Sequence, residues 1–100
     1  VTPPGPIDAA ERPEVGLARL GKLVEQDKSQ PAIAALALYD TLSPRLEGDH
    51  LAEAMYDKGQ ALITLKQTTE ACTVLREDSA KYTRGTHVER AVNAILGACP

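Results

Sequence analysis

The stretch of sequence that decides the fold runs from Asp49 to Tyr82 and reads DHLAEAMYDKGQALITLKQTTEACTVLREDSAKY. Apolar side chains recur along it at spacings of three and four residues, which is the pattern of an amphipathic helix. The pattern stops after Leu65 and restarts at Thr68, so it predicts two helices joined by a short turn. The first helix is expected to begin near His50, with Asp49 as its N-cap. The positions expected to be buried are Leu51, Ala54, Met55, Leu62 and Leu65 in the first helix and Ala71, Val74, Leu75, Ser79 and Tyr82 in the second.

Two more helices are predicted before this stretch. Pro13 suits the first turn of a helix that ends near Gln26. The next helix is expected to begin at a Ser29 cap and to end where Ser43 and Pro44 interrupt it. Apolar residues lie on most sides of this second helix, so we expect it to be the most buried one. They are Ile33, Ala34, Leu36, Ala37, Leu38 and Leu42.

A last helix is predicted near the C-terminus. Thr86 and Glu89 form a capping box, in which each side chain satisfies a backbone amide of the other residue, and the helix stops at Gly97. β-branched residues are few and scattered, which argues against a sheet. We therefore predict an all-α domain over residues 13–100, preceded by a flexible proline-rich segment over residues 1–12.

Composition limits the functions that this chain can have. One hundred residues make one domain. A net charge of -3, a pI near 5.3 and the lack of a basic patch argue against nucleic acid and against an anionic membrane surface as partners. The longest nearly unbroken apolar run, residues 32–39, is much shorter than the roughly 20 residues of a membrane span, so no span is expected. Because the sequence begins with Val1 rather than Met, we expect a processed or excised piece of a longer protein.

No catalytic, metal or cofactor site is expected. His50 and His87 are isolated in the sequence and are interpreted as surface residues. The two cysteines lack the short Cys-x-x-Cys spacing of a metal site. The serines and threonines have no adjacent His/Asp pattern that would activate a nucleophile. We therefore do not expect an enzyme.

Cys72 and Cys99 allow two interpretations. They are free core thiols if the protein is cytosolic, or one disulfide if it is exported. About a dozen helical residues separate Cys72 from the turn near Arg84, and a similar number lead back from Thr86 to Cys99, so antiparallel helices would bring both sulfurs to the same end. We favour the disulfide and keep the free thiols as the alternative.

The first half of the chain resembles the second. When Gly21 is set on Gly59, Leu17 falls on Met55 and Val24 on Leu62, although Leu20 falls on Lys58. Each of these two helices is followed by a polar turn and by a helix of small and apolar residues, and the first turn is expected to be about two residues longer.

A unit of two helices with a small residue inside the first resembles the tetratricopeptide repeat. Two such units and a C-terminal capping helix would form a short right-handed solenoid. A glycine in a helix costs roughly 1 kcal/mol relative to alanine, so we expect Gly21 and Gly59 to lie at close helix crossings that need the space.

The second half carries a more specific resemblance. The segments Ala54-Met55-Tyr56, Gly59-Gln60-Ala61-Leu62, Glu70-Ala71-Cys72-Thr73-Val74-Leu75, Lys81-Tyr82 and Gly97-Ala98-Cys99 together are similar to the C-terminal end of the Tol-Pal-associated periplasmic YbgF/CpoB family. The resemblance implies a periplasmic location and partners in the Tol-Pal envelope machinery. It also implies a role in coordinating cell-wall work with constriction of the outer membrane during division.

The solenoid predicts a groove for a protein partner. In tetratricopeptide arrays the first helix of each pair lines the concave surface, which here exposes Glu53, Tyr56, Gln60, Ile63 and Thr64 from one helix and Val15, Ala18, Lys22, Glu25 and Gln26 from the other. Tyrosine and isoleucine among carboxylates would suit an amphipathic or basic peptide. Asp49, Glu53 and Asp57 recur every four residues, and the alternative interpretation is that they form an ordinary solvated helix face.

The function predicted from sequence is a non-catalytic module that scaffolds a bacterial cell-envelope complex through a protein or peptide partner. Oligomerisation is compatible with the sequence. Two alternatives remain: a cytosolic tetratricopeptide-type adaptor or chaperone, and a small helical enzyme subunit. The redox state of the cysteines would distinguish the first alternative, and a buried polar constellation would favour the second.

Overall fold

The computed structural model describes residues 12–81 together with residues 93, 97 and 99. This part of the chain contains four α-helices and one short 3-10 helix, and the all-α prediction is therefore confirmed. The helices are α1 (Pro13–Glu25), α2 (Ser29–Leu42), α3 (Gly48–Thr64) and α4 (Thr68–Lys81), with η1 (Ser43–Arg45) after α2. None of the described helices is both long enough and apolar enough to cross a membrane.

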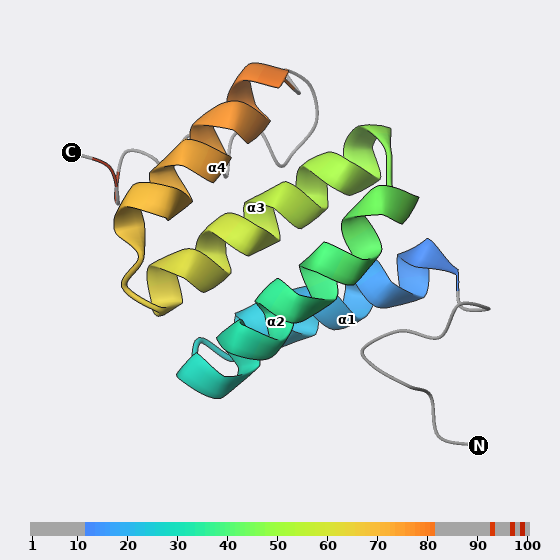
Figure 1. Cartoon of the computed structure of the whole chain (residues 1–100), viewed down its shortest axis with the longest axis horizontal. Coiled ribbons are helices and arrows are strands. Elements are labelled where there is room, and N and C mark those ends of the chain that lie inside the picture. The colour runs from blue at the N-terminus through green and yellow to red at the C-terminus, as the bar shows by residue number, and fades with distance from the viewer. Residues whose placement is uncertain (1–11, 82–92, 94–96, 98, 100) are drawn as a thin grey trace.

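The helices form two antiparallel hairpins, α1 with α2 and α3 with α4 (Figure 1). α3 packs against α4 within its own hairpin and against both α1 and α2 of the other. η1 contacts α2. α3 is therefore the central helix on which the two hairpins meet.

Leucine and alanine fill the core between the hairpins. Burying one leucine side chain contributes about 1.5 to 3 kcal/mol, and the alanines allow the helix backbones to approach closely. The cluster that joins α1, α2 and α3 consists of Leu17, Leu20, Ala32, Ala35, Leu38, Leu42, Leu46, Ala54 and Ala61.

α2 is less buried than its composition predicts. Only four of its 14 residues are buried, against seven of the 17 residues in α3, and Ile33 is 52% exposed. The prediction that the second helix is the most buried one was wrong, because α2 packs against α1 and α3 on one side only. The centre of the fold is the helix with neighbours on more sides.

The two glycines that match in the repeat have different surroundings. A Cβ atom added to Gly59 would lie 2.5 Å from Cδ2 of Leu75, so the prediction of a close crossing between α3 and α4 is confirmed there. A Cβ atom added to Gly21 would meet nothing within 4 Å. The same prediction for Gly21 was wrong, because no neighbouring helix comes near its Cα.

Both hairpin turns have three residues, 26–28 and 65–67, so the expected longer first turn was wrong. Each turn has a left-handed residue one position past the C-cap, Asp27 with φ 52° and Lys66 with φ 65°. In the second turn, the Gln67 amide donates to the Leu62 carbonyl at 2.8 Å and the Lys66 amide to Ile63 at 3.0 Å. This is the Schellman pattern, which satisfies the last carbonyls of a helix.

Two helix starts differ from the prediction. The N-cap of α2 is Lys28 rather than Ser29, and the N-cap of α3 is Glu47 rather than Asp49. Neither cap makes a side-chain hydrogen bond. Gly48, the first residue of α3, adopts a φ of +59°, which glycine takes without the steric cost of a side chain.

The buried side of α4 also differs from the prediction. Ala71 and Leu75 are buried as expected, but Val74 and Ser79 are only partly buried. Asp78, which was not expected in the core, is fully buried instead. Because Ala71, Leu75 and Asp78 follow one another at spacings of four and three, they form one stripe along the helix.

Some predictions concern residues outside the described part of the chain. They are the proline-rich segment, except for Arg12, the buried position of Tyr82, and most of the last helix after Thr86. Asn93 and Gly97, which the structure describes, have helical conformations.

The sulfur atoms of Cys72 and Cys99 are 2.09 Å apart, at disulfide distance, and their Cα atoms are 5.7 Å apart. The predicted pairing is therefore supported. The bond joins α4 to a residue 27 positions further along the chain. In the chain-entropy model, closing a loop of that length contributes about 3.5 kcal/mol to the free energy of unfolding.

We predict opposite effects for alanine at the two matching glycines. Gly59→Ala should lower the free energy of unfolding by about 1 to 3 kcal/mol, because the new methyl group overlaps Leu75. Gly21→Ala should raise it by about 0.5 to 1 kcal/mol, because its site is open and alanine favours the helix. Urea unfolding followed by circular dichroism measures both. Equal effects of the two substitutions would contradict this account of the α3–α4 crossing.

The disulfide generates a second prediction. The double variant Cys72→Ala and Cys99→Ala should lose about 3.5 kcal/mol of stability if the chain-entropy term dominates. Each single variant should lose a similar amount, because either one opens the loop. Thermal unfolding of the oxidised, the reduced and the alanine proteins provides the measurement. Oxidised and reduced proteins with the same melting temperature would contradict a stabilising bond.

Candidate functional site

A cleft of about 520 Å³ lies between α1 and α3. α1 and α3 supply opposite walls, and the turn after α1 closes one end. The lining residues are Gly21, Val24, Glu25, Asp27, Glu53, Tyr56, Asp57, Gln60 and Thr64. We call this site the acidic cleft.

Five of the ten residues that the sequence analysis assigned to a groove lie together in the structure. Glu25 from α1 and Glu53, Tyr56, Gln60 and Thr64 from α3 all line the acidic cleft. The partly buried Ile63 is not among its lining residues. Lys22, Val15 and Ala18 line a separate hollow on α1, and Gln26 is exposed in the turn.

The sequence analysis missed Asp57 as part of the site. It was grouped with Asp49 and Glu53 on a solvated face, and those two side chains are indeed exposed. Asp57, however, is only 9% exposed. It is three residues after buried Ala54 and four before buried Ala61, and that spacing places it on the face of α3 that packs against the first hairpin.

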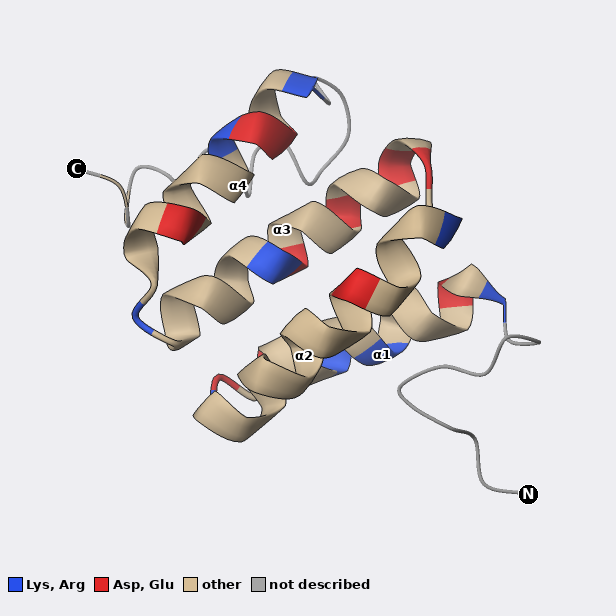
Figure 2. Ribbon diagram, viewed as in Figure 1, with Lys and Arg blue, Asp and Glu red and all other residues tan. Residues whose placement is uncertain are grey.

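The charge of the cleft is negative. Its lining includes four carboxylates, on Glu25, Asp27, Glu53 and Asp57, and no lysine or arginine. Figure 2 shows where the acidic and basic residues lie on the four helices. Carboxylates gathered in a concave site focus a negative potential and attract cations. The site is therefore suited to a lysine or arginine side chain of a bound segment.

One hydrogen bond orients the closed end of the cleft. The Thr64 hydroxyl, at the last residue of α3, donates to Oδ1 of Asp27 at 2.9 Å. Asp27 lies in the turn between α1 and α2, so the bond links the two hairpins across the cleft. The bond holds Oδ1 of Asp27 in place and thereby restricts the orientation of the whole carboxylate.

Tyr56 and Gln60 form the uncharged part of the α3 wall. Both are partly buried and they lie one helical turn apart. A tyrosine ring provides a large apolar contact together with a hydroxyl, and a glutamine amide both donates and accepts hydrogen bonds. These groups can contact the backbone and the apolar side chains of an extended peptide.

A second cleft of about 400 Å³ lies between α2, α3 and α4 on the other side of α3. Its notable contact joins Lys58 to Tyr39, with Nζ 4.8 Å from the ring centroid. Lys58 stands at the repeat position of Leu20, which is fully buried. The aliphatic part of the lysine side chain takes the place of the leucine at that repeat position. Its ammonium group lies over an aromatic ring, which is a cation–π contact.

Within the part of the chain that the structure describes, no group of three or more His, Cys, Asp or Glu residues could hold a metal ion. His50 is exposed on the first turn of α3, as the sequence predicted, and His87 lies outside the described residues. The acidic cleft contains five of the residues that the sequence analysis assigned to a groove, more than either the hollow on α1 or the second cleft.

Comparisons with family models, with curated proteins and with solved structures found no match to this chain. The function is therefore argued from the geometry and charge of the acidic cleft.

Proposed function

We propose that this chain is a non-catalytic protein-interaction module of the tetratricopeptide type, and that the acidic cleft binds a segment of a protein partner. The observation that carries the proposal is the composition of the cleft. Five residues assigned to a groove from the sequence repeat line one cavity between α1 and α3. Clefts between helices are common binding sites.

The arrangement of the hairpins supports the tetratricopeptide assignment. α1 and α3 are the first helices of the two related units, and they pack against each other. The two units have turns of equal length. Stacked helical hairpins bury a continuous core and leave one surface lined by the first helices, and that surface is where such arrays bind extended segments.

The chemistry of the cleft favours an amphipathic segment that carries lysine or arginine. The carboxylates of Glu25 and Glu53 are on exposed residues, so they can pair with a partner's cations at the rim. Rim charges contribute chiefly to the association rate and to specificity. Tyr56 provides the aromatic anchor that carries much of the binding energy in many interfaces.

We further propose that the module works in a bacterial periplasm, where the resemblance to the YbgF/CpoB family implies Tol-Pal partners and a role in cell division. Disulfides form and persist in oxidising compartments, so the distance between Cys72 and Cys99 supports an exported protein. In freshly isolated protein, two alkylatable thiols would instead favour the cytosolic adaptor.

The binding proposal predicts the effect of a triple alanine variant. Replacing Glu53, Tyr56 and Gln60 by alanine should weaken binding at least tenfold, with most of the loss already present in Tyr56→Ala. The partner is first captured from an envelope extract with the wild-type chain and identified by mass spectrometry. Its affinity for each purified variant is then measured by calorimetry.

A matched control separates binding from folding. Alanine at Glu70, Thr73 and Arg76 removes three exposed side chains of α4, away from the cleft. This control should bind the partner like the wild type, and both triple variants should keep nearly the wild-type melting temperature. If the cleft variant binds with wild-type affinity, the acidic cleft is not the binding site.

A further inference from the structure

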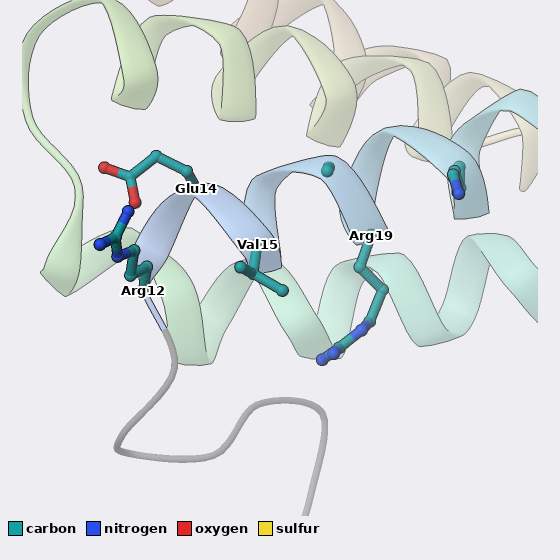
Figure 3. A pocket seen from close by; sticks show the side chains of 6 residues that line it. Arg12, Glu14, Val15 and Arg19 are labelled. Atoms are coloured by element: carbon teal, nitrogen blue, oxygen red, sulfur yellow. The ribbon is translucent and has the colours of Figure 1, made fainter.

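The outward face of α1 carries a second concave surface. α1 packs against α2 and α3, and on its remaining face Val15 is 46% exposed. This face contains a hollow of about 580 Å³. It is lined by Arg12, Glu14, Val15, Ala18, Arg19 and Lys22, and we call it the basic hollow. In Figure 3 Val15 lies between the side chains of Arg12 and Arg19.

The basic hollow and the acidic cleft have opposite charge. The hollow has three cationic side chains and one carboxylate, whereas the cleft has four carboxylates and no cation among its lining residues. They follow each other along the same helix, with Lys22 in the hollow and Glu25 in the cleft. One molecule therefore presents two neighbouring concave surfaces that complement each other.

The spacing along α1 allows both surfaces to be used at once. The exposed residues Val15, Ala18, Lys22 and Glu25 recur at intervals of three, four and three, so they form one stripe. From Val15 to Glu25 the helix rises about 15 Å. A two-fold axis perpendicular to α1 at the middle of this stripe pairs each end of the stripe with the opposite end in a second copy. The basic N-terminal end of one helix then lies against the acidic C-terminal end of the other.

We infer that two copies of this chain associate through α1 in an antiparallel, two-fold symmetric dimer, with the basic hollow of each copy against the acidic cleft of the other. A two-fold interface uses the same surface on both subunits, so that surface must be complementary to itself. Glu25 of one copy then lies opposite Val15 of its partner, beside Arg12 and Arg19, and the symmetry repeats this contact. Val15 is covered in the same contact, which removes apolar surface from water.

Charge also sets the orientation and the strength of this dimer. A parallel arrangement of the two α1 helices brings like charges together, which disfavours that orientation. The antiparallel arrangement avoids this. The exposed ion pairs are screened by salt beyond about 8 to 10 Å at physiological ionic strength. The dimer therefore dissociates as the salt concentration rises.

The inference does not rest on the proposed function, because it concerns the purified chain alone. The dimer nevertheless uses Glu25 and Glu53 of the acidic cleft. A partner segment that binds there competes with self-association, so the monomer is the form that accepts the partner.

Sedimentation equilibrium of the purified chain tests the dimer directly. At low salt the mass should approach twice the 10.7 kDa of the monomer, and it should fall toward the monomer as salt is added. A mass of one chain at every concentration up to the solubility limit overturns the inference. If such a monomer still binds a partner in the cleft, the proposed function stands while the dimer is rejected.

Two charge-reversed variants identify the surfaces. One carries Arg12→Glu and Arg19→Glu, and the other carries Glu25→Lys and Glu53→Lys. Each variant alone should dimerise about a hundredfold more weakly or worse, because all facing charges are alike. An equimolar mixture should restore a heterodimer, because every surface of one variant then meets a complementary surface of the other.

The mixture also excludes misfolding as the cause of dissociation, since a misfolded variant does not recover its partner. Arg76→Glu with Lys81→Glu on α4 is the control for a general change of net charge, and it should dimerise like the wild type. Reversed variants that dimerise normally, or a mixture that stays monomeric, overturn the antiparallel contact.

Discussion

The close contact between Gly59 and Leu75 is the constraint on which the rest of the structure depends. Because α3 has no side chain at that point, α4 approaches it closely and Leu75 is fully buried. One face of α3 is thereby used within its own hairpin. The opposite side of α3, with Ala54 and Ala61, packs into the core of the first hairpin. α3 lies at the centre because the small residues on these two faces let other helices pack closely on both sides of it.

The acidic cleft is a consequence of the way α1 meets α3. The two helices contact each other, and mostly polar side chains from both line the cleft. Asp57 is drawn into this contact and becomes nearly buried, while Thr64 and Asp27 join the hairpins at one end. Three of the four carboxylates are thus held on helices, and Asp27, in the turn after α1, is held by the hydrogen bond from Thr64. Rigid support of this kind favours a preorganised binding surface.

α1 connects the two proposals because it contributes to both concave surfaces. Its basic residues lie beside the hollow, and Glu25 lies in the acidic cleft. The acidic cleft can bind either a cationic segment of another protein or the basic hollow of a second copy, because both present positive charge to its carboxylates. We therefore propose that self-association and partner binding are alternatives. In that scheme, the concentration of the chain and the ionic strength set how much of the cleft is open to a partner.

Local signals in the sequence predicted the four described helices, whereas the faces that these helices bury depend on tertiary packing. Apolar periodicity, Pro13 and the interruption at Ser43 and Pro44 predicted the helices to within a few residues. The resemblance to the tetratricopeptide repeat predicted five of the nine residues that line the cleft. The exposure of Ile33, the burial of Asp57 and the contrast between Gly21 and Gly59 were not predictable in the same way. A helix pattern depends on the residue's own neighbours in the chain, whereas burial depends on which other helix packs against it.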